Sequence, residues 1–489
     1  MNPTTPAIAG AGQSVQRPGD WARPEDARGA IELIVDAARA AAADAGSARL
    51  LAKVGWIGVA GGFFPHVNPG QVVAEQLGIP DAATALSTIS GSAPQDMLTL
   101  AATRIASGRL DAALIVGGEA RWSQKRLVAL GERPQWIRSP GTGTPEPVGA
   151  FDDDLIEEMG RLGVASTAYA LFEDSLRIGR GRDLDTHRSE IAGLWSRFSS
   201  VAAANPYAWD RAAHTALSIR EASAANRMIA FPYPKAMVAN NTVDLASAIL
   251  LCSVHTAQEV GISGDRLVFP HVATTGEDTV RIAERDVLHE TPALAAAGNA
   301  ALKQVGITVE EIAHLDLYAC FPSIVEMSCE SLGIDPKRAL TLTGGLGFAG
   351  AAVSNSSGHA IAAMVPRARE GGWALIHANG GGATKHAFGI YAAHPPEGGF
   401  RHLDERGRTP LNPRRRAGRD WPGKGSVEAA TVVYDRSGPT HVVASLRAPD
   451  GSRGLVRSDD ADLIDRAHSD GLAGMAGPLP GWSRLDPPA

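Results

Sequence analysis

Cysteine, aromatic side chains and long apolar runs are all scarce in this sequence of 489 residues. Its three cysteines, Cys252, Cys320 and Cys329, do not make a disulfide framework. No apolar run is long enough to span a bilayer, so we expect no membrane span. No basic head precedes the apolar start of the chain, which therefore predicts a first strand instead of a signal peptide. A cytoplasmic protein is the simplest interpretation.

An excess of positive charge is also missing. The formal net charge is −7, which removes any electrostatic case for binding nucleic acid. The chain is instead 44% hydrophobic and contains 54 glycines, a composition that suits a large globular enzyme. Its length exceeds one compact domain and is sufficient for three.

Helical and strand patterns alternate through the first 120 residues. We expect a helix at Gly29–Ala48, a strand at Val54–Gly61 and a second helix at Pro69–Leu77. A strand, a helix and another strand then follow within Thr84–Ala120. This order predicts a mainly parallel sheet covered by helices.

The segment Thr84–Ala120 contains the most unusual helix of the chain. From Met97 to Ala106 nearly every position is small or apolar, which indicates a helix buried on all sides. The turn Ser90-Gly91-Ser92 precedes this helix. Free backbone N–H groups at such a buried helix start can hold an anion or activate a nucleophile.

This segment resembles the nucleophile region of thiolases, which reads Cys-Gly-Ser-Gly-x-Gln before a buried helix. Ser90-Gly91-Ser92-Ala93-Pro94-Gln95 matches that motif in register, and Gly117-Gly118-Glu119 follows at close to the family's spacing. The acyl-accepting cysteine of thiolases falls on Ser90. A hydroxyl is a far weaker nucleophile than a thiolate unless a base adjoins it.

The resemblance implies an α/β thiolase fold, with two similar βαβαβαββ halves in a five-layer αβαβα core and a small C-terminal β domain. We expect the first half over residues 1–285, including a loop domain over about 121–235, and the second half over 286–400. A linker and the additional β-rich C-terminal domain are expected over residues 401–489. The extra domain makes the chain similar to the group called thiolase-like protein type one.

Several local expectations belong to this picture. Gly141–Asp153 is rich in Gly, Pro and Asp and predicts a loop, and Leu155–Arg180 predicts one helix. Asp244 matches a thiolase carboxylate that opens a buried helix. Arg401–Lys424 predicts a linker. The later strands are expected at 427–435, 441–447 and 454–457.

The second half is expected to contain strands at 267–272 and 307–317, a helix at 291–305 and a buried helix at Asn355–Glu370. Leu317-Tyr318-Ala319-Cys320-Phe321 lies where sterol-carrier-type thiolases have His-Asp-Cys-Phe. Tyr318 then replaces the residue that binds the thioester oxygen; its phenol is either an oxyanion donor or a packed aromatic. Cys320 is either the acid/base thiol of that subfamily or a buried, inert cysteine.

Two further thiolase motifs are altered. The histidine of Gly-His-Pro falls on Ala351 without gaps, so either that histidine is lost or His359, eight residues on, replaces it. The general-base cysteine falls on Ala378, but Gly380 and Gly381 remain and allow close approach to a ligand. His377 and His386 are further candidates for substrate binding.

Two hypotheses follow from these matches. The first is a thiolase-like, acetyl-CoA acetyltransferase-like enzyme that transfers or condenses acyl groups through Ser90, Cys320, Tyr318 and His359. It takes a coenzyme A thioester as substrate and requires neither a further cofactor nor a metal. The second is a non-catalytic acyl-CoA-binding or assembly protein on a thiolase scaffold. Because thiolases are usually dimers, a homodimer is a possible assembly.

Overall fold

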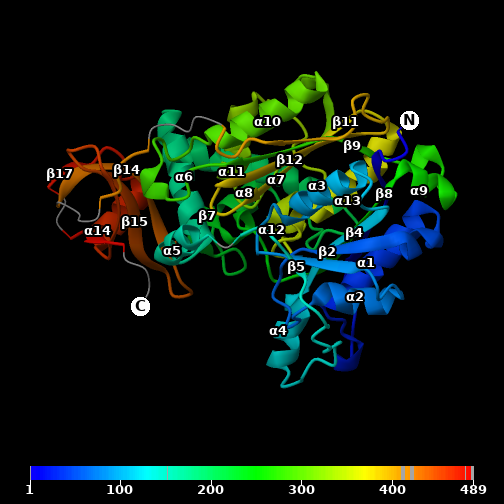
Figure 1. Cartoon of the computed structure of the whole chain (residues 1–489). Coiled ribbons are helices and arrows are strands. Elements are labelled where there is room, and N and C mark those ends of the chain that lie inside the picture. The colour runs from blue at the N-terminus through cyan, green and yellow to red at the C-terminus, as the bar shows by residue number, and fades with distance from the viewer. Residues whose placement is uncertain (1, 151, 409–413, 419–422, 479–480, 486–489) are drawn as a thin grey trace.

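The computed structural model describes residues 2–150, 152–408, 414–418, 423–478 and 481–485. Two sheets form the core, with two buried helices between them and further helices on the outer faces (Figure 1). This is the expected five-layer αβαβα arrangement, and the thiolase fold is confirmed. Among the described helices, none is both long enough and apolar enough to cross a membrane.

The N-terminal sheet has the strand order β1-β8-β4-β2-β3-β5. Strands β4, β2, β3 and β5 are parallel, whereas β8 is antiparallel to both β1 and β4. The strands are β1 (Pro6–Val15), β2 (Val54–Val59), β3 (Ala83–Ser87), β4 (Ala112–Ala120), β5 (Glu146–Val148) and β8 (Asp244–Ser253). Helices α1 (Ala30–Ala45), α2 (Pro69–Leu77) and α9 (Val254–Glu259) pack against it from outside.

The second sheet has the order β10-β11-β12-β9-β13. It contains β9 (Phe269–Glu277), β10 (Ile312–Asp316), β11 (Trp373–Gly380), β12 (Lys385–Ala392) and β13 (Arg401–Asp404). Helices α10 (Pro292–Val305) and α11 (Pro322–Leu332) cover this part of the molecule. The central layer consists of α3 (Ala93–Ala106) and α13 (Ser356–Glu370). Met97 and Leu98 of α3 share one apolar cluster with Ile361 and Met364 of α13.

The α-helices that the structure describes between β4 and β8 in the chain are α4 (Arg121–Ala129), α5 (Asp153–Leu162), α6 (Ala165–Gly179), α7 (Leu184–Ala204) and α8 (Ala216–Arg220). The short α12 (Gly345–Phe348) precedes α13. The single helix expected over Leu155–Arg180 is wrong. Gly163, at a left-handed φ of 75°, ends α5, and Val164 is extended before α6 begins.

The helix expected to open at Asp244 is also wrong, because Asp244 begins strand β8. The run from Leu245 to Cys252 is buried at every position, as for a strand covered on both faces. The Asp244 carboxylate does meet a helix start, but of another helix. It accepts hydrogen bonds from the backbone N–H groups of Trp122 and Ser123, at 2.8 Å and 3.1 Å, in the first turn of α4.

Two segments expected to lack regular structure contain strands. Within Gly141–Asp153, β5 pairs with the edge strand β3. Within Arg401–Lys424, β13 pairs with β9, and residues 409–413 and 419–422 of that range lie outside the described residues. In both places a neighbouring strand edge supplies the hydrogen-bond partners, which local composition does not reveal.

The C-terminal sheet combines strands from distant parts of the chain. Its order is β18-β16-β15-β14-β6-β7, and β17 also pairs with β14. It contains β6 (Met228–Ala230), β7 (Tyr233–Pro234), β14 (Lys424–Tyr434), β15 (Pro439–Arg447), β16 (Arg453–Ser458), β17 (Ala476–Pro478) and β18 (Ser483–Arg484). The helix α14 (Ala461–Ser469), absent from the sequence expectations, packs on it. Figure 1 shows this domain at the opposite end of the molecule from α1 and α2.

A buried arginine fixes the C-terminal domain to the core. Arg453 on β16 is 1% exposed, and its Nε donates to Glu428 Oε2 at 2.6 Å. The same guanidinium donates to the backbone oxygens of Arg285 and Asp286, which belong to the segment before α10. One buried side chain therefore pairs with the half-buried Glu428 carboxylate, which also binds Arg447, and with two carbonyls across the domain boundary.

Replacing Arg453 by methionine is expected to lower the free energy of unfolding by about 3–5 kcal/mol, because Glu428 and two carbonyls lose a buried partner. Urea denaturation measures the change. Arg457→Met is the matched control, since Arg457 lies on the same strand, its side chain is 42% exposed, and it pairs with the exposed Asp459. That control is expected to cost less than about 1 kcal/mol. Equal costs for the two variants would contradict this account.

Candidate active site

The turn at Ser90 and Gly91 lies where the two central helices begin. The Ser90 backbone N–H donates to Ser354 Oγ at 3.1 Å, and Ser357 Oγ donates to the Gly91 carbonyl at 2.9 Å. Ser354 precedes α13 and Ser357 lies in its first turn. The amino ends of α3 and α13 therefore meet at this turn, one from each half of the molecule.

Close packing brings Tyr318 and Gly380 to the same turn. A Cβ atom on Gly91 would lie 2.1 Å from Tyr318 Oη and 2.3 Å from the Asn379 carbonyl oxygen. A Cβ atom on Gly380 would lie 2.3 Å from Ser90 Oγ. Only glycine fits at these two positions while the neighbours stay in place. The structure thus brings Ser90, Tyr318 and Gly380 together, as the sequence predicts.

Tyr318 is buried and protonated. Burial raises the pKa of its phenol above the usual range, and the nearby Cys320 raises it further, whereas a hydrogen bond with Ser356 acts in the opposite direction. A neutral phenol is a hydrogen-bond donor. Tyr318 is therefore able to donate a hydrogen bond to an oxygen bound at the Ser90 turn.

His359 lies in the first turn of α13. Its Nδ1 is 2.8 Å from Gln13 Oε1, and within the described parts of the chain its Nε2 has no hydrogen-bond partner. Burial lowers the pKa of His359 from 6.5 to about 4, so the ring is neutral at pH 7. Among the described residues, no hydrogen bond joins His359 to Ser90. Its catalytic role stays a prediction.

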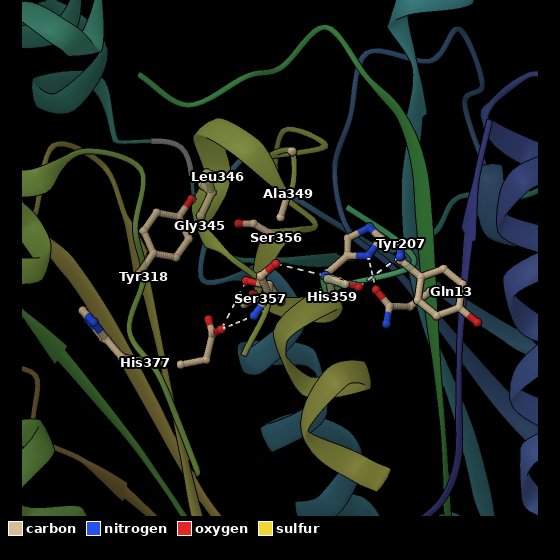
Figure 2. Close-up of a pocket in the computed structure, with 14 residues that line it drawn as sticks. Gln13, Tyr207, Tyr318, Gly345, Leu346, Ala349, Ser356, Ser357, His359 and His377 are labelled. Carbon is tan, nitrogen blue, oxygen red and sulfur yellow. Dashed lines mark hydrogen bonds between the residues drawn. The ribbon is translucent and has the colours of Figure 1, made fainter. Parts of the chain in front are cut away.

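His359 faces a small cavity that Tyr318 and His377 also line. Figure 2 shows His359, Ser356 and Ser357 at the start of α13, with Gln13 and Tyr207 beyond His359 and with Tyr318 and His377 on the opposite side. The cavity volume is about 10 Å³, which is room for about one water molecule. An acyl chain does not fit into this space as it stands.

Cys320 lines neither this cavity nor the larger one described below. Its side chain is buried, and burial raises the pKa of the thiol to about 12, although a hydrogen bond with Tyr169 lowers it in part. The sulfur is therefore a neutral thiol at pH 7. The acid/base role of Cys320 stays a prediction, and its surroundings favour the inert alternative.

A much larger cavity, of about 740 Å³, opens beside Ser90. Its walls come from α3, from the segment between β5 and α5, and from β9, β12 and β13. The polar and charged residues that line it are Ser87, Thr88, Ser90, Ser92, Asp96, Thr99, Thr103, Asp152, Asp153, Asp154, Thr275, Glu277, Lys385, His386, His402 and Arg406. The volume lies in the range typical of small-molecule sites.

His377 and His386 stand between the two cavities. His377 lines the small cavity and His386 the large one. His377 Nε2 is 3.4 Å from His386 Nδ1, and His386 Nε2 is 3.5 Å from Asp278 Oδ2. Burial, followed by the neighbouring His386, lowers the pKa of His377 well below its usual value. Of these two histidines, His386 lines the same cavity as Ser90. Gly381, the other glycine expected at the substrate, adjoins Leu155 and Thr384 and not Ser90.

Ser92 and Asp96 are polar residues of this site that sequence reasoning missed. Ser90 Oγ lies 2.8 Å from Ser92 Oγ, which donates to Asp96 Oδ2 at 2.7 Å. The signal was the i, i+4 spacing of Ser92 and Asp96, which places both side chains on one face of a helix start.

The strand order, the two central helices and the serine turn together define a protein of the thiolase superfamily. Over 97% of its length the chain is 30% identical to the monomeric SCP2-thiolase-like protein type 1 of Mycobacterium smegmatis, with 96% of that structure covered and a TM-score of 0.81. Residues 410–479 match the family described as the thiolase-like protein type 1 additional C-terminal domain. The chain therefore belongs to the thiolase-like protein type 1 family.

More distant structures share the fold alone. The dimeric peroxisomal thiolase of Saccharomyces cerevisiae is 14% identical, with a TM-score of 0.55 over 80% of this chain and 98% of that one. The Ltp2–ChsH2(DUF35) aldolase is 17% identical, with a TM-score of 0.60 over 80% and 98%. A comparison with curated proteins gave no significant match.

Replacing Gly91 by alanine is expected to destabilise the fold by about 1–3 kcal/mol, because the new methyl group must displace Tyr318 and the Asn379 backbone. Urea denaturation measures the loss. Gly193→Ala is the control, since Gly193 lies within α7 with no atom near its missing Cβ. That change is expected to be neutral or stabilising, by up to about 1 kcal/mol. A Gly91→Ala variant as stable as the wild type would show that the turn is not packed as described.

The lowered pKa of His359 predicts a pH-dependent stability. The unfolded ring binds a proton below about pH 6.5, whereas the folded ring does so only near pH 4, so stability falls as the pH drops through this window. His359→Gln removes this titrating ring. Between pH 7 and pH 5, its free energy of unfolding is therefore expected to fall by about 2 kcal/mol less than that of the wild type. Denaturation at the two pH values measures it; parallel losses would contradict the assignment.

Proposed function

We propose that the protein transfers acyl groups from coenzyme A thioesters and that Ser90 accepts the acyl group in place of the cysteine of thiolases. The observation that carries the proposal is the position of the Ser90 hydroxyl. It lies at the amino end of a buried helix, is bonded to a second hydroxyl, and faces a cavity of about 740 Å³.

The surroundings of Ser90 support an acyl-transfer step. The partial positive charge at the start of α3 favours the negative charge that develops on a thioester oxygen under attack. The neutral Tyr318 phenol, which packs against Gly91, is a candidate second donor for that oxygen. In this scheme Ser90 Oγ attacks the thioester carbonyl and displaces the coenzyme A sulfur.

The fold does not by itself select this reaction, since it also carries the aldolase named above. The alternative is a thiolase scaffold that binds acyl-CoA without chemistry. It is consistent with the neutral Cys320 thiol and the small cavity at His359. The two functions differ in one respect that can be measured, which is a covalent acyl group on Ser90.

Incubation with short-chain and long-chain acyl-CoA thioesters, followed by mass spectrometry of the protein, tests the proposal. The wild type is expected to gain the mass of the acyl group on the peptide that contains Ser90 and to release one free thiol for each adduct. Ser90→Ala is expected to lose both signals. Ser90→Cys is expected to acylate faster, because a thiolate is the stronger nucleophile.

Ser107→Ala is the matched control, because it removes a hydroxyl at the other end of α3, where Ser107 bonds to two helix carbonyls and to Arg109. It is expected to acylate as the wild type does. Saturable acyl-CoA binding by calorimetry, without any adduct or thiol release, would replace the proposal with the non-catalytic alternative. An adduct on another residue would refute the assignment to Ser90.

A further inference from the structure

Ser92 occupies the N-cap of α3 without capping it. A serine at this position usually accepts a hydrogen bond from a backbone N–H in the first turn. Ser92 makes no such bond, and its own backbone is already in the helical region, with φ −82° and ψ −14°. Its hydroxyl instead lies between Ser90 Oγ, at 2.8 Å, and Asp96 Oδ2, at 2.7 Å. The Ser92 side chain therefore links Ser90 to Asp96 and does not cap the start of α3.

The chemistry of the three groups fixes the direction of the two hydrogen bonds. An ionised carboxylate only accepts, so the Ser92 proton points to Asp96. A hydroxyl has one proton, so Ser92 Oγ accepts from the Ser90 hydroxyl. The Ser92 backbone N–H also points to Ser90 Oγ, at 3.3 Å. The Ser90 proton thus has a defined path away from the oxygen that would act as nucleophile.

Asp96 is suited to receive that proton. Among the described residues its carboxylate has one hydrogen-bond donor, Ser92, and no Lys or Arg nitrogen within 4 Å. Burial raises the pKa of Asp96 from 3.8 to about 6, and the bond from Ser92 and the charges of Arg406 and Lys385 partly oppose this. The carboxylate is therefore ionised at pH 7, yet more basic than an exposed aspartate.

We propose that Ser90, Ser92 and Asp96 form a hydroxyl relay in which Asp96 takes the Ser90 proton through Ser92 when Ser90 attacks. As an account of acyl transfer, the inference rests on the function proposed above. Ser92 touches the attacking oxygen, whereas Asp96 acts through Ser92 and is a positioning residue. The relay supplies the base that a hydroxyl nucleophile needs and that the usual cysteine and histidine no longer provide.

The step balances without a further reactant. As the bond from Ser90 Oγ to the thioester carbon forms, the Ser90 proton passes to Ser92 and the Ser92 proton passes to Asp96. The carbon–sulfur bond breaks, and the departing thiolate takes the proton of the Ser92 hydroxyl, which Asp96 replaces with the proton it had received. The products are an acyl ester on Ser90, a free thiol and an ionised Asp96.

The pH dependence of the relay is set by the groups around the cavity. Three basic side chains face Asp96 across the cavity: Lys385 from β12, His402 from β13 and Arg406 from the turn that follows β13. Burial lowers the pKa of His402, so its ring adds positive charge only below its usual pKa. The acidic residues Asp152, Asp153, Asp154 and Glu277 and the imidazole of His386 complete the titratable lining. The relay is expected to switch on as the pH rises through about 6, when Asp96 ionises.

An alkyl fluorophosphonate, which phosphonylates activated serines and releases fluoride, tests the relay independently of any thioester. The rate of Ser90 labelling in the full-length protein is measured by mass spectrometry from pH 4.5 to 8.5. The wild-type rate is expected to rise through a midpoint near pH 6. Asp96→Asn is expected to label about 100-fold more slowly and to lose the midpoint.

Variants at Ser92 separate the relay from a structural role. Ser92→Ala is expected to slow labelling as much as Asp96→Asn, whereas Ser92→Thr, which keeps the hydroxyl, is expected to restore it. Ser107→Ala is expected to match the wild type, and thermal melting verifies that each variant is folded. A wild type that is not labelled on Ser90, or an Asp96→Asn variant with an unchanged pH profile, would overturn the relay.

The same variants distinguish failure of the relay from failure of the proposed function. Labelling of Ser90 that depends on Asp96, together with no adduct from any acyl-CoA, would retain the relay and reject the thioester as substrate. An acyl adduct on Ser90 that forms equally fast in Asp96→Asn would retain the proposed function and reject the relay.

Discussion

The contact between the starts of α3 and α13 is the constraint on which the rest of the structure depends. Both helices are enclosed between two sheets, where an unpaired polar group is costly. Ser354 and Ser357 bond to the Ser90–Gly91 backbone, and Asn355 bonds to the Gly117 carbonyl of β4 at 2.7 Å. These few hydrogen bonds fix the relative position of the two halves at the one point where an acyl group would react.

The chemical groups at this point are almost all uncharged. Cys320 is a neutral thiol, His359 is a neutral imidazole and Tyr318 is a neutral phenol, in each case because burial disfavours the charged form. The larger cavity carries most of the charged side chains, where Lys385 and Arg406 line the wall together with acidic residues. In the proposed function, hydroxyl groups and the Asp96 carboxylate move the protons.

Much of the fold was predictable because its signals are local. The helix at Pro69–Leu77 has Pro at its start and Gly78 at its end, and the helix that ends at Ala106 is small or apolar at nearly every position from Met97 on, so pattern alone located both. The expected burial of the second helix on all sides was wrong for one face, where Thr99 and Thr103 line the larger cavity. The strand at Asp244–Ser253 was predicted as a helix start from its match to a thiolase motif, and its apolar run, which is buried on both faces, has no period that separates the two structures. The strands β5 and β13 depend on partners distant in sequence, which no local pattern contains.

The site was predictable to the extent that backbone motifs define it. The glycines at Gly91 and Gly380 marked the places where chain segments approach closely, and Ser90 followed from the same motif. The two cavities were not predictable, because each arises from side chains on several elements that are distant in the chain. Ser92 and Asp96 were visible in the sequence, but their hydrogen bonds depend on a backbone that leaves the N-cap hydroxyl free to turn toward Ser90.

The shared C-terminal sheet also bears on how the chain reaches its native state. Strand β6 pairs with β14 through Ala230 and Val433, so a segment from the middle of the chain completes its hydrogen bonds only after the last domain has been synthesised. Contacts of such long sequence separation slow folding. During translation, the edge of β6 that pairs with β14 stays unpaired until the last domain is made, and the ribosome-bound intermediate is therefore expected to be the stage at which this protein most needs a chaperone.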